Sequence, residues 1–314
     1  MMNRAVFILS LDCEGKWGMA DHITHHHRTF FTNANLTKAY SDLLHVLDNK
    51  NLKATFAFVG ALTLSPDEYH AKRELFGDSP ASRVWLQQFT QDIKSNVYDG
   101  WFAPHLLQAV IADGQHEIAS HGFSHLPLNE ATTSFEDAER ELKAVASISC
   151  QKGFTPKTFV YPRNEIGYRY LLPMFGYVGY RDRLPSPRGI AGRVHNLAKE
   201  FHLFSISQPH SSCEPLVTLA PGYFLNWRFG LRKAVPLTVT SKRWKSIIDD
   251  AVHRKAVAHM WLHPHNLIDG HLQLRLLEHV LDYVSQKIRH DEIINSTQVE
   301  YVSAVLKQGK PVCV

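Results

Sequence analysis

The sequence predicts an α/β fold built on a parallel β-sheet. Short apolar segments alternate along the chain with segments whose apolar residues recur every three or four positions, which is the pattern of strands followed by amphipathic helices. Ionisable residues directly follow several apolar segments, and parallel α/β barrels assemble their active sites at such strand ends. A doubly wound sheet remains the alternative to a barrel, because these patterns do not report strand closure.

Each predicted strand is a short apolar segment that ends at a polar residue or a turn. The first, residues 5–11, is AVFILSL, a nearly continuous apolar run that ends before Asp12, as expected for a buried parallel strand. The strands that follow are ATFAFVGAL (54–62), HEIAS (116–120), TFVYP (158–162), GYVGY (176–180), LFSIS (203–207) and VAHMWL (257–262).

The predicted helices occupy the segments between these strands. In the first of them, apolar residues recur at helical spacing from Leu36 to Leu47, and Asn51 follows as a stop signal. Further helices are predicted over 104–112, 134–150, 241–253 and 273–289, with a final amphipathic turn near 299–306. Ser134 and Asp137 have the spacing of a capping box at the start of the second of these.

Length and composition predict one folded domain over residues 1–314. Apolar residues make up 44% and charged residues 20% of the 314, which supplies a sizeable core and excludes a disordered chain. No Gly/Ser-rich linker or internal repeat divides the sequence. The least regular stretches, at about 64–100 and 184–227, are predicted to be long loop excursions that cover or shape a site.

Charge and cysteine usage exclude several classes of protein. The net charge of +4 comes without a compact Lys/Arg block, so no nucleic-acid partner is predicted. Basic residues recur between Arg181 and Lys233 and predict a positive rim suited to a phosphate-bearing substrate. The four scattered cysteines indicate neither a disulfide framework nor a zinc knuckle. No membrane span and no secretory signal are found, so a cytoplasmic protein is predicted.

Four polar clusters stand at or just beyond predicted strand ends. They are Asp12-Cys13-Glu14-Gly15, Ser120-His121-Gly122-Phe123-Ser124-His125, Tyr161-Pro162-Arg163-Asn164 and Trp261-Leu262-His263-Pro264-His265-Asn266. Carboxylates at i and i+2 of an extended chain point the same way, and two imidazoles four residues apart can meet one metal where a glycine lets the chain turn. Arg163 could hold a carboxylate ionised, and His263 or His265 could donate a proton. His25, His26 and His27 are interpreted as solvated residues, and Trp85, Trp101 and Trp227 as core or pocket wall.

Motifs of other enzyme classes are absent from the sequence. It contains no phosphate loop, dinucleotide-binding glycine fingerprint, GxSxG elbow or HExxH zinc helix. An iron(II) oxygenase also uses two histidines and one carboxylate, but its ligands usually sit on an antiparallel sheet. The alternating pattern disfavours that class.

In this order, DCEG, SHGFSH, YPRN and WLHPHN resemble the successive motifs of the polysaccharide deacetylase, or NodB-homology, family. The resemblance runs from Leu9 to about Asn266 and identifies the chain as a divergent member. It implies an irregular (β/α) barrel and a metal-dependent hydrolase that removes an acyl group from a sugar nitrogen. It also implies one divalent ion, with Zn²⁺ ahead of Co²⁺, Ni²⁺, Fe²⁺ or Mn²⁺.

The resemblance assigns a role to each motif residue. Asp12 would be the general base, and Glu14, His121 and His125 would bind the metal. Arg163 would tune Asp12, and His263 would be the general acid, with His265 in reserve. The family more commonly has two adjacent aspartates, so the spaced pair here leaves open an exchange of the base and ligand roles. Asp182 is the candidate for the aspartate that orients the acid.

The predicted substrate is an N-acetyl or N-formyl amino sugar, linked to a nucleotide or lipid and used in surface polysaccharide biosynthesis. The missing secretory signal and the basic residues from Arg181 to Lys233 favour such a precursor over a wall polymer. Two alternatives remain. One is a hydrolase of a small non-sugar amide, and the other is a non-catalytic carbohydrate-binding barrel.

Overall fold

The computed structural model of the chain describes residues 4–184, 206–207, 212–213, 216–228, 230–268 and 270–307. Within these ranges, ten strands form one sheet in the order β6-β7-β5-β4-β3-β2-β1-β9-β8, and β10 pairs with β1. All pairings are parallel except that of β6 with β7. The strands are β1 (Ala5–Cys13), β2 (Thr55–Phe58), β3 (Glu117–Ser120), β4 (Thr158–Val160), β5 (Gly179–Arg181), β6 (Ser212–Cys213), β7 (Leu216–Leu219), β8 (Tyr223–Phe224), β9 (Val257–Leu262) and β10 (Ile293–Asn295).

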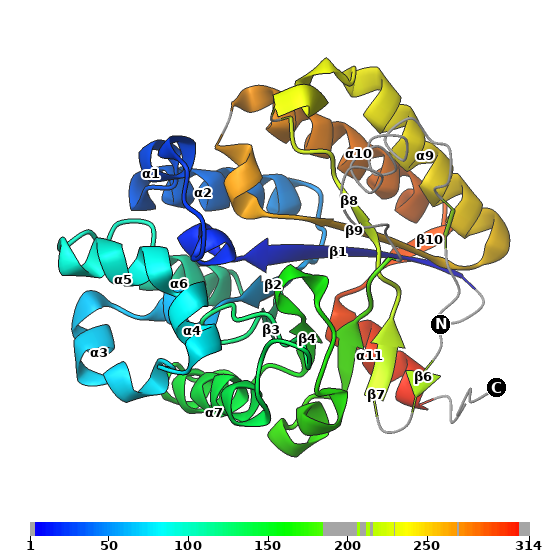
Figure 1. Ribbon diagram of the computed structural model, residues 1–314. Coiled ribbons are helices and arrows are strands. Elements are labelled where there is room, and N and C mark those ends of the chain that lie inside the picture. The colour runs from blue at the N-terminus through cyan, green and yellow to red at the C-terminus, as the bar shows by residue number, and fades with distance from the viewer. Residues whose placement is uncertain are drawn as a thin grey trace.

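The curl of the sheet distinguishes a barrel from a doubly wound sheet. From β1 to β5 each new strand is added on the same side of the previous one, and the late strands β9 and β8 lie on the other side of β1. Arg181 of β5 donates two hydrogen bonds to Asp12 of β1 although β4, β3 and β2 lie between these strands, so the sheet must curl. The sheet curls into an open half-barrel surrounded by helices, so the predicted (β/α) barrel is confirmed. Figure 1 shows β1 and β9 side by side through its middle.

Helices surround the sheet. The α-helices are α1 (His25–Phe30), α2 (Asn33–Asn49), α3 (Pro66–Ala71), α4 (Pro80–Trp85), α5 (Gln87–Lys94), α6 (Pro104–Asp113), α7 (Phe135–Gln151), α9 (Leu237–Arg254), α10 (His271–Arg289) and α11 (Gln298–Lys307). The 3₁₀ helices are η1 (Gly15–Met19), η2 (Gly60–Thr63), η3 (Arg73–Leu75), η4 (Pro162–Asn164), η5 (Arg169–Phe175), η6 (Gly230–Ala234) and η7 (Pro264–Leu267). Within the described ranges, no helix combines the length and apolarity needed to cross a membrane.

The helices predicted from periodicity are confirmed. They are α2, α6, α7, α9 and α10, and the expected final turn is the ten-residue helix α11. At the start of α7, Ser134 accepts a hydrogen bond from the Asp137 backbone nitrogen at 3.2 Å. The return half of the predicted capping box is absent, because the Asp137 carboxylate accepts hydrogen bonds from Ser79 and Arg140 instead. The predicted excursion at 64–100 contains α3, η3, α4 and α5.

The predicted strands are found wherever the structure describes them, although several are shorter than expected. The predicted segment 203–207 falls largely outside the described residues, and 206–207 form no strand. Strands β6, β7, β8 and β10 were not predicted, and at two to four residues each they are too short to show a period.

The two faces of the sheet have different environments. Because paired residues in a parallel sheet share a face, the concave face alternates along β1 as Val6, Ile8, Ser10 and Asp12. Val6 and Ile8, nearer the amino end of β1, pack with apolar residues of β7 and β9. The intervening β1 residues pack against α9 and belong to a core cluster that also includes residues of α2 and α10. The concave face is therefore apolar near the amino ends of the strands and polar near their carboxyl ends.

Candidate metal centre and active site

The three predicted metal ligands meet at the carboxyl ends of β1 and β3. Glu14 Oε2 lies 3.0 Å from His125 Nε2 and 3.4 Å from His121 Nε2, and the two Nε2 atoms are 3.0 Å apart. All three side chains are buried. We call Glu14, His121 and His125 the first ligand cluster.

The first ligand cluster fits a divalent metal ion. Ligand atoms about 2.0–2.1 Å from a tetrahedral zinc ion are about 3.3 Å from one another, which is close to the separations observed here. His121 Nδ1 donates to the Val160 carbonyl at 2.8 Å, so its Nε2 lone pair faces the cluster. Burial lowers the pKa of His125 to about 4, which keeps its imidazole in the neutral, metal-binding form. The cluster therefore has the chemistry of a candidate metal site.

A buried glutamate on α7 holds the loop that carries the two histidines. The chain turns at Gly122 and His125, which have φ angles of +77° and +61°. Glu141 Oε2 accepts hydrogen bonds from the backbone nitrogens of Phe123 and Ser124 at 2.9 and 2.8 Å, and its Oε1 accepts from Ser124 Oγ at 2.5 Å. Glu141 is not predicted from the sequence, because nothing in the α7 pattern distinguishes it from a solvated acid.

Asp12 is paired with Arg181 rather than with Arg163. Two guanidinium nitrogens of Arg181 donate to the Asp12 oxygens at 2.8 and 2.7 Å, and both side chains are buried. Burial alone would raise the pKa of Asp12, but the charge and hydrogen bonds of Arg181, with His121 and His263, together outweigh it and hold that pKa below the usual range. Asp12 Oδ2 lies 4.0 Å from His121 Nε2, beside the first ligand cluster.

Arg163, predicted to tune Asp12, is paired with another carboxylate. Arg163 forms two hydrogen bonds with Asp21, at 2.6 and 3.0 Å, and lies 4.4 Å above the Trp85 ring. The reason is the turn after β4, where Arg163 and Asn164 both have positive φ angles of 53° and 54°. This turn directs Arg163 to the rim, whereas Asn164 Oδ1 accepts a hydrogen bond from Arg181 at 3.2 Å.

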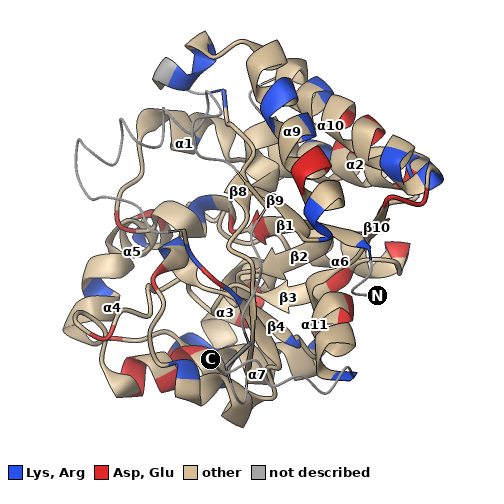
Figure 2. Cartoon of the chain, turned by 90° about the vertical axis from the view of Figure 1, so that its right-hand side faces the viewer, with Lys and Arg blue, Asp and Glu red and all other residues tan. Residues whose placement is uncertain are grey.

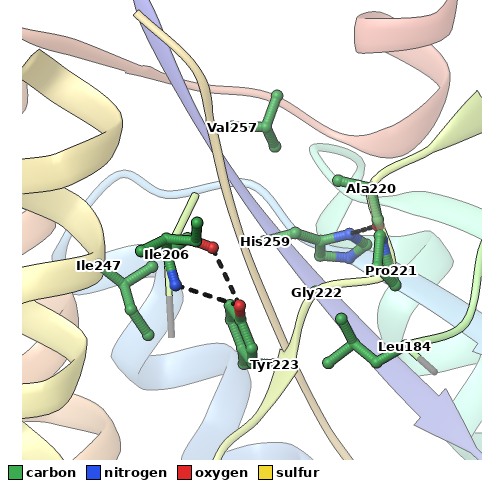
Figure 3. Close-up of a pocket in the computed structure, with 9 residues that line it drawn as sticks. All are labelled: Leu184, Ile206, Ala220, Pro221, Gly222, Tyr223, Ile247, Val257 and His259. Carbon is green, nitrogen blue, oxygen red and sulfur yellow. Dashed lines mark hydrogen bonds between the residues drawn. The ribbon is translucent and has the colours of Figure 1, made fainter. Parts of the chain in front are cut away.

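A chain of buried hydrogen bonds fixes Arg181 from behind. Arg181 donates to Ser10 Oγ at 3.2 Å, and Ser10 Oγ lies 2.8 Å from His259 Nε2. His259 Nδ1 donates to the Ala220 carbonyl at 2.7 Å, which is drawn in Figure 3. Since Nδ1 carries this hydrogen, Nε2 of the neutral ring accepts from Ser10. A small apolar pocket that includes Tyr223 lies beside His259.

His263 faces the first ligand cluster from the end of β9. Its Nε2 lies 3.4 Å from Glu14 Oε1, and its Nδ1 lies 3.3 Å from Asn266 Oδ1. Burial alone would raise the pKa of Glu14, but His263 and then His125 outweigh it and hold that pKa well below the usual range. The expected orienting role of Asp182 is not seen, because its Oδ1 accepts from the Arg183 backbone nitrogen and Asn266 contacts His263.

His265 lies behind His263 in an aromatic wall. The two imidazole rings are stacked with centroids 4.7 Å apart. The His265 ring also packs 4.5 Å from Phe31 and 6.1 Å from Trp227, measured between ring centroids. His26 on α1 is 6.3 Å from Trp227. Trp227 is thus a wall residue beside the predicted acid.

The other tryptophans are structural. Trp101 is fully buried, and its carbonyl accepts a hydrogen bond from Trp17. Trp85 donates to the Ser124 carbonyl at 2.9 Å and lies against His125 with ring centroids 5.7 Å apart, so it is both core and pocket wall.

The predicted basic rim is described only in part. Arg181 is buried on Asp12 and cannot belong to a solvated rim. Residues 185–205, 208–211, 214–215 and 229 of the stretch lie outside the described residues. Elsewhere, Figure 2 shows basic and acidic residues interspersed along the helices.

Comparisons with known proteins agree with this fold. A family model described as polysaccharide deacetylase matches residues 26–172, which include SHGFSH and YPRN. A Mycobacterium smegmatis protein described as a polysaccharide deacetylase has a similar structure, with a TM-score of 0.65 at 14% identity over 98% of this chain and 93% of that chain.

Two further solved structures are similar. The structure described as a polysaccharide deacetylase from Pseudomonas aeruginosa PAO1 has a TM-score of 0.58 at 14% identity, over 98% of this chain and 92% of that chain. Puue allantoinase has a TM-score of 0.60 at 11% identity, over 98% and 92% of the respective chains. No curated protein matches the sequence significantly. The family match over residues 26–172 and the order of the strand-end motifs support assignment of the chain to the polysaccharide deacetylase, or NodB-homology, family, and the solved structures share its fold.

Proposed function

We propose that the protein is a metal-dependent amide hydrolase that removes an N-acetyl or N-formyl group from an amino sugar or sugar conjugate. The observation that carries the proposal is the first ligand cluster, which lies beside an ionised carboxylate and opposite a third imidazole at one end of the barrel. Zinc is the metal we propose first, since two imidazoles and a carboxylate suit it, and Co²⁺, Ni²⁺, Fe²⁺ and Mn²⁺ are alternatives.

Asp12 is the proposed general base. When bound, a divalent metal acidifies a water molecule and polarises the acyl carbonyl. Arg181 keeps Asp12 ionised, and each carboxylate oxygen retains a lone pair beyond the one that accepts from Arg181. Asp12 is therefore able to take a proton from water at a position beside His121.

His263 is the proposed general acid. Its Nδ1 is held by Asn266, so its Nε2 faces the site and would deliver a proton to the departing amine. His265 remains the reserve candidate, since it stacks on His263 in the same wall. Arg163 is proposed to shape the mouth of the site through Asp21 and Trp85, in place of the tuning role predicted for it.

The substrate to test first is an amino sugar linked to a nucleotide or lipid, as in surface polysaccharide biosynthesis. Zinc-loaded protein would be incubated with N-acetylated and N-formylated sugar nucleotides, with N-acetylglucosamine oligomers and with a hydantoin-type cyclic amide. Release of acetate or formate from the sugar nucleotides is the expected result, with loss of at least a hundredfold in His125→Ala and no loss in the surface variant His45→Ala.

The other outcomes favour different functions. Release from oligomers alone would overturn the linked-sugar substrate, and ring opening alone would favour a small-amide hydrolase. Binding of sugars without release from any substrate would favour a non-catalytic carbohydrate-binding barrel.

A further inference from the structure

The guanidinium group of Arg181 has an acceptor for each of its four terminal hydrogens. Its Nη1 donates to Ser10 Oγ at 3.2 Å and to Asp12 Oδ1 at 2.8 Å, and its Nη2 donates to Asp12 Oδ2 at 2.7 Å and to Asn164 Oδ1 at 3.2 Å. The guanidinium carbon lies 4.7 Å from the Trp261 ring centroid, so the ring limits its tilt. Ser10 and Asn164 therefore flank Asp12 and fix the rotation of the guanidinium in its own plane.

Ser10 holds Arg181 in this way only if its own hydrogen points elsewhere. A serine hydroxyl donates one hydrogen and accepts with its lone pairs. His259 Nε2 lies 2.8 Å from Ser10 Oγ, and Nε2 is the acceptor because His259 Nδ1 donates to the Ala220 carbonyl at 2.7 Å. The Ser10 hydrogen is thus directed at His259, and a lone pair faces Arg181. Without the imidazole acceptor, the hydroxyl could rotate its hydrogen toward Arg181 and weaken this contact.

His259 is itself anchored at the opening of the barrel. Strands β7 and β8 lie towards opposite ends of the sheet, yet only residues 220–222 separate them along the chain. This link packs directly on His259, because Ala220 accepts its Nδ1 hydrogen and a Cβ added at Gly222 would lie 2.8 Å from its carbonyl oxygen (Figure 3). His259, Ser10 and Arg181 therefore form a relay of hydrogen bonds from this link to Asp12.

We propose that His259 is a positioning residue for the general base. It directs the Ser10 hydroxyl, and Ser10 in turn sets the orientation in which Arg181 holds both oxygens of Asp12. The inference rests on the proposed function, in which Asp12 takes a proton from water. A small rotation of the guanidinium moves both Asp12 oxygens, and a misplacement of about 1 Å in a reacting group can lower a rate about 100-fold.

The relay reaches the site through Asp12 and not through the metal ligands. Replacement of His259 should therefore lower kcat and leave both KM and the affinity for Zn²⁺ unchanged. A variant that distorted the whole site would instead change all three quantities. The division between kcat and the two binding constants thus separates positioning of the base from a general structural role.

Two polar variants separate the two hydrogen bonds of His259. A glutamine amide reaches about as far as imidazole Nε2 and keeps an acceptor for Ser10, whereas an asparagine amide reaches about as far as Nδ1 and keeps only the donor for Ala220. Zinc-loaded protein would be assayed with the sugar nucleotide that wild type deacylates fastest. His259→Asn and His259→Phe are expected to lower kcat about 10–100-fold, and His259→Gln to recover most of the loss. Ser10→Ala interrupts the relay with a smaller change in volume and should match His259→Phe.

His116→Phe is the matched control. The His116 side chain is also buried, and its Nδ1 accepts a hydrogen bond from the Ala54 backbone nitrogen at 3.3 Å. It precedes β3, at the end of the strand opposite to the first ligand cluster. This variant should therefore lose stability without losing kcat.

The orientation of Arg181 can also be followed without any reaction. In ¹⁵N-labelled, zinc-loaded protein, terminal guanidinium hydrogens that are held by acceptors rotate slowly and give separate NMR signals, which Arg181→Lys would identify by their loss. Separate signals are expected in wild type, His259→Gln and His116→Phe. They should merge in His259→Asn, His259→Phe and Ser10→Ala.

Several results would overturn the inference. They are an unchanged kcat in His259→Asn and His259→Phe, a loss in His259→Gln as large as that in His259→Phe, a parallel loss of Zn²⁺ affinity, or Arg181 signals that stay separate in every variant. No release of acetate or formate by wild type would overturn the proposed function. The Arg181 signals would then still decide whether His259 orients that residue.

Discussion

Breaking the buried pair of Arg181 and Asp12 should cost more than removing both charges. The side chains are 1% and 4% exposed and share two hydrogen bonds of 2.8 and 2.7 Å. At about 1.5–3 kcal/mol for each charge-assisted hydrogen bond, the two are worth about 3–6 kcal/mol. The general cost of leaving one partner of a buried pair alone, about 3–5 kcal/mol, agrees with this sum. Arg181→Leu should therefore lower the free energy of unfolding by about 3–5 kcal/mol.

The double variant separates pairing from packing. In Asp12→Leu/Arg181→Leu no buried charge is left alone, so its free energy of unfolding should exceed that of Arg181→Leu. Urea unfolding of metal-free protein at pH 7 would measure both, because bound metal would add its own stabilisation. Arg163→Leu is the matched control, since its pair with Asp21 is 39% and 29% exposed and should be worth about 1 kcal/mol or less. A double variant less stable than Arg181→Leu would refute the argument.

Three further predictions test the surroundings of the site. Glu141→Gln replaces an acceptor of the ligand loop by a donor and should weaken Zn²⁺ binding about 10–100-fold in competition with a chromogenic chelator; unchanged affinity would contradict the role of this residue. Burial alone would raise the pKa of Asp137, but the hydrogen bonds from its serine and arginine partners outweigh it and lower that pKa. The ionised Asp137 therefore stabilises the folded protein fully above the unfolded-state pKa of about 4, and this stabilisation is lost as the pH falls through the lower pKa of the folded state. Urea midpoints should then fall less below pH 4 in Asp137→Asn than in wild type. Gly222→Ala places a Cβ 2.8 Å from the His259 carbonyl oxygen at a φ of +69° and should cost more than about 1 kcal/mol, whereas Gly114→Ala, with a similar φ but open space, should cost less; equal melting temperatures of the two variants would argue against close packing at His259.

The parts of the site that the sequence predicted are those whose chemistry is contiguous along the chain. His121 and His125 belong to one turn that follows one strand, so their convergence depends on a single local conformation. Glu14 joins them because adjacent parallel strands end at the same edge of the sheet, which the order β3-β2-β1 provides. Neither step requires knowledge of how far the sheet curls.

Arg181 was missed because its contact with Asp12 depends on that curl. β5 and β1 are separated in the sheet by β4, β3 and β2, and the pair forms across the concave face. Arg163 follows β4, and the sequence alone gives no reason to prefer Arg181 over Arg163 as the partner of Asp12. The left-handed turn at Arg163 and Asn164 directs the Arg163 side chain to the rim and away from Asp12. Arg181 directly follows the predicted strand 176–180, so its position at a strand end is the sequence signal that marks it as a candidate site residue.

The geometry bears on the roles proposed for the spaced acidic pair, Asp12 and Glu14. Asp12 and Glu14 share the concave face because Cys13 between them points outward into the core behind β1. Both Asp12 oxygens are held by Arg181, and the nearest cluster nitrogen is 4.0 Å away. The Glu14 oxygens lie 3.0 and 3.4 Å from the cluster nitrogens. The longer Glu14 side chain, which begins one residue beyond β1, reaches the proposed metal position. This geometry favours Glu14 as ligand and Asp12 as base over the exchanged roles.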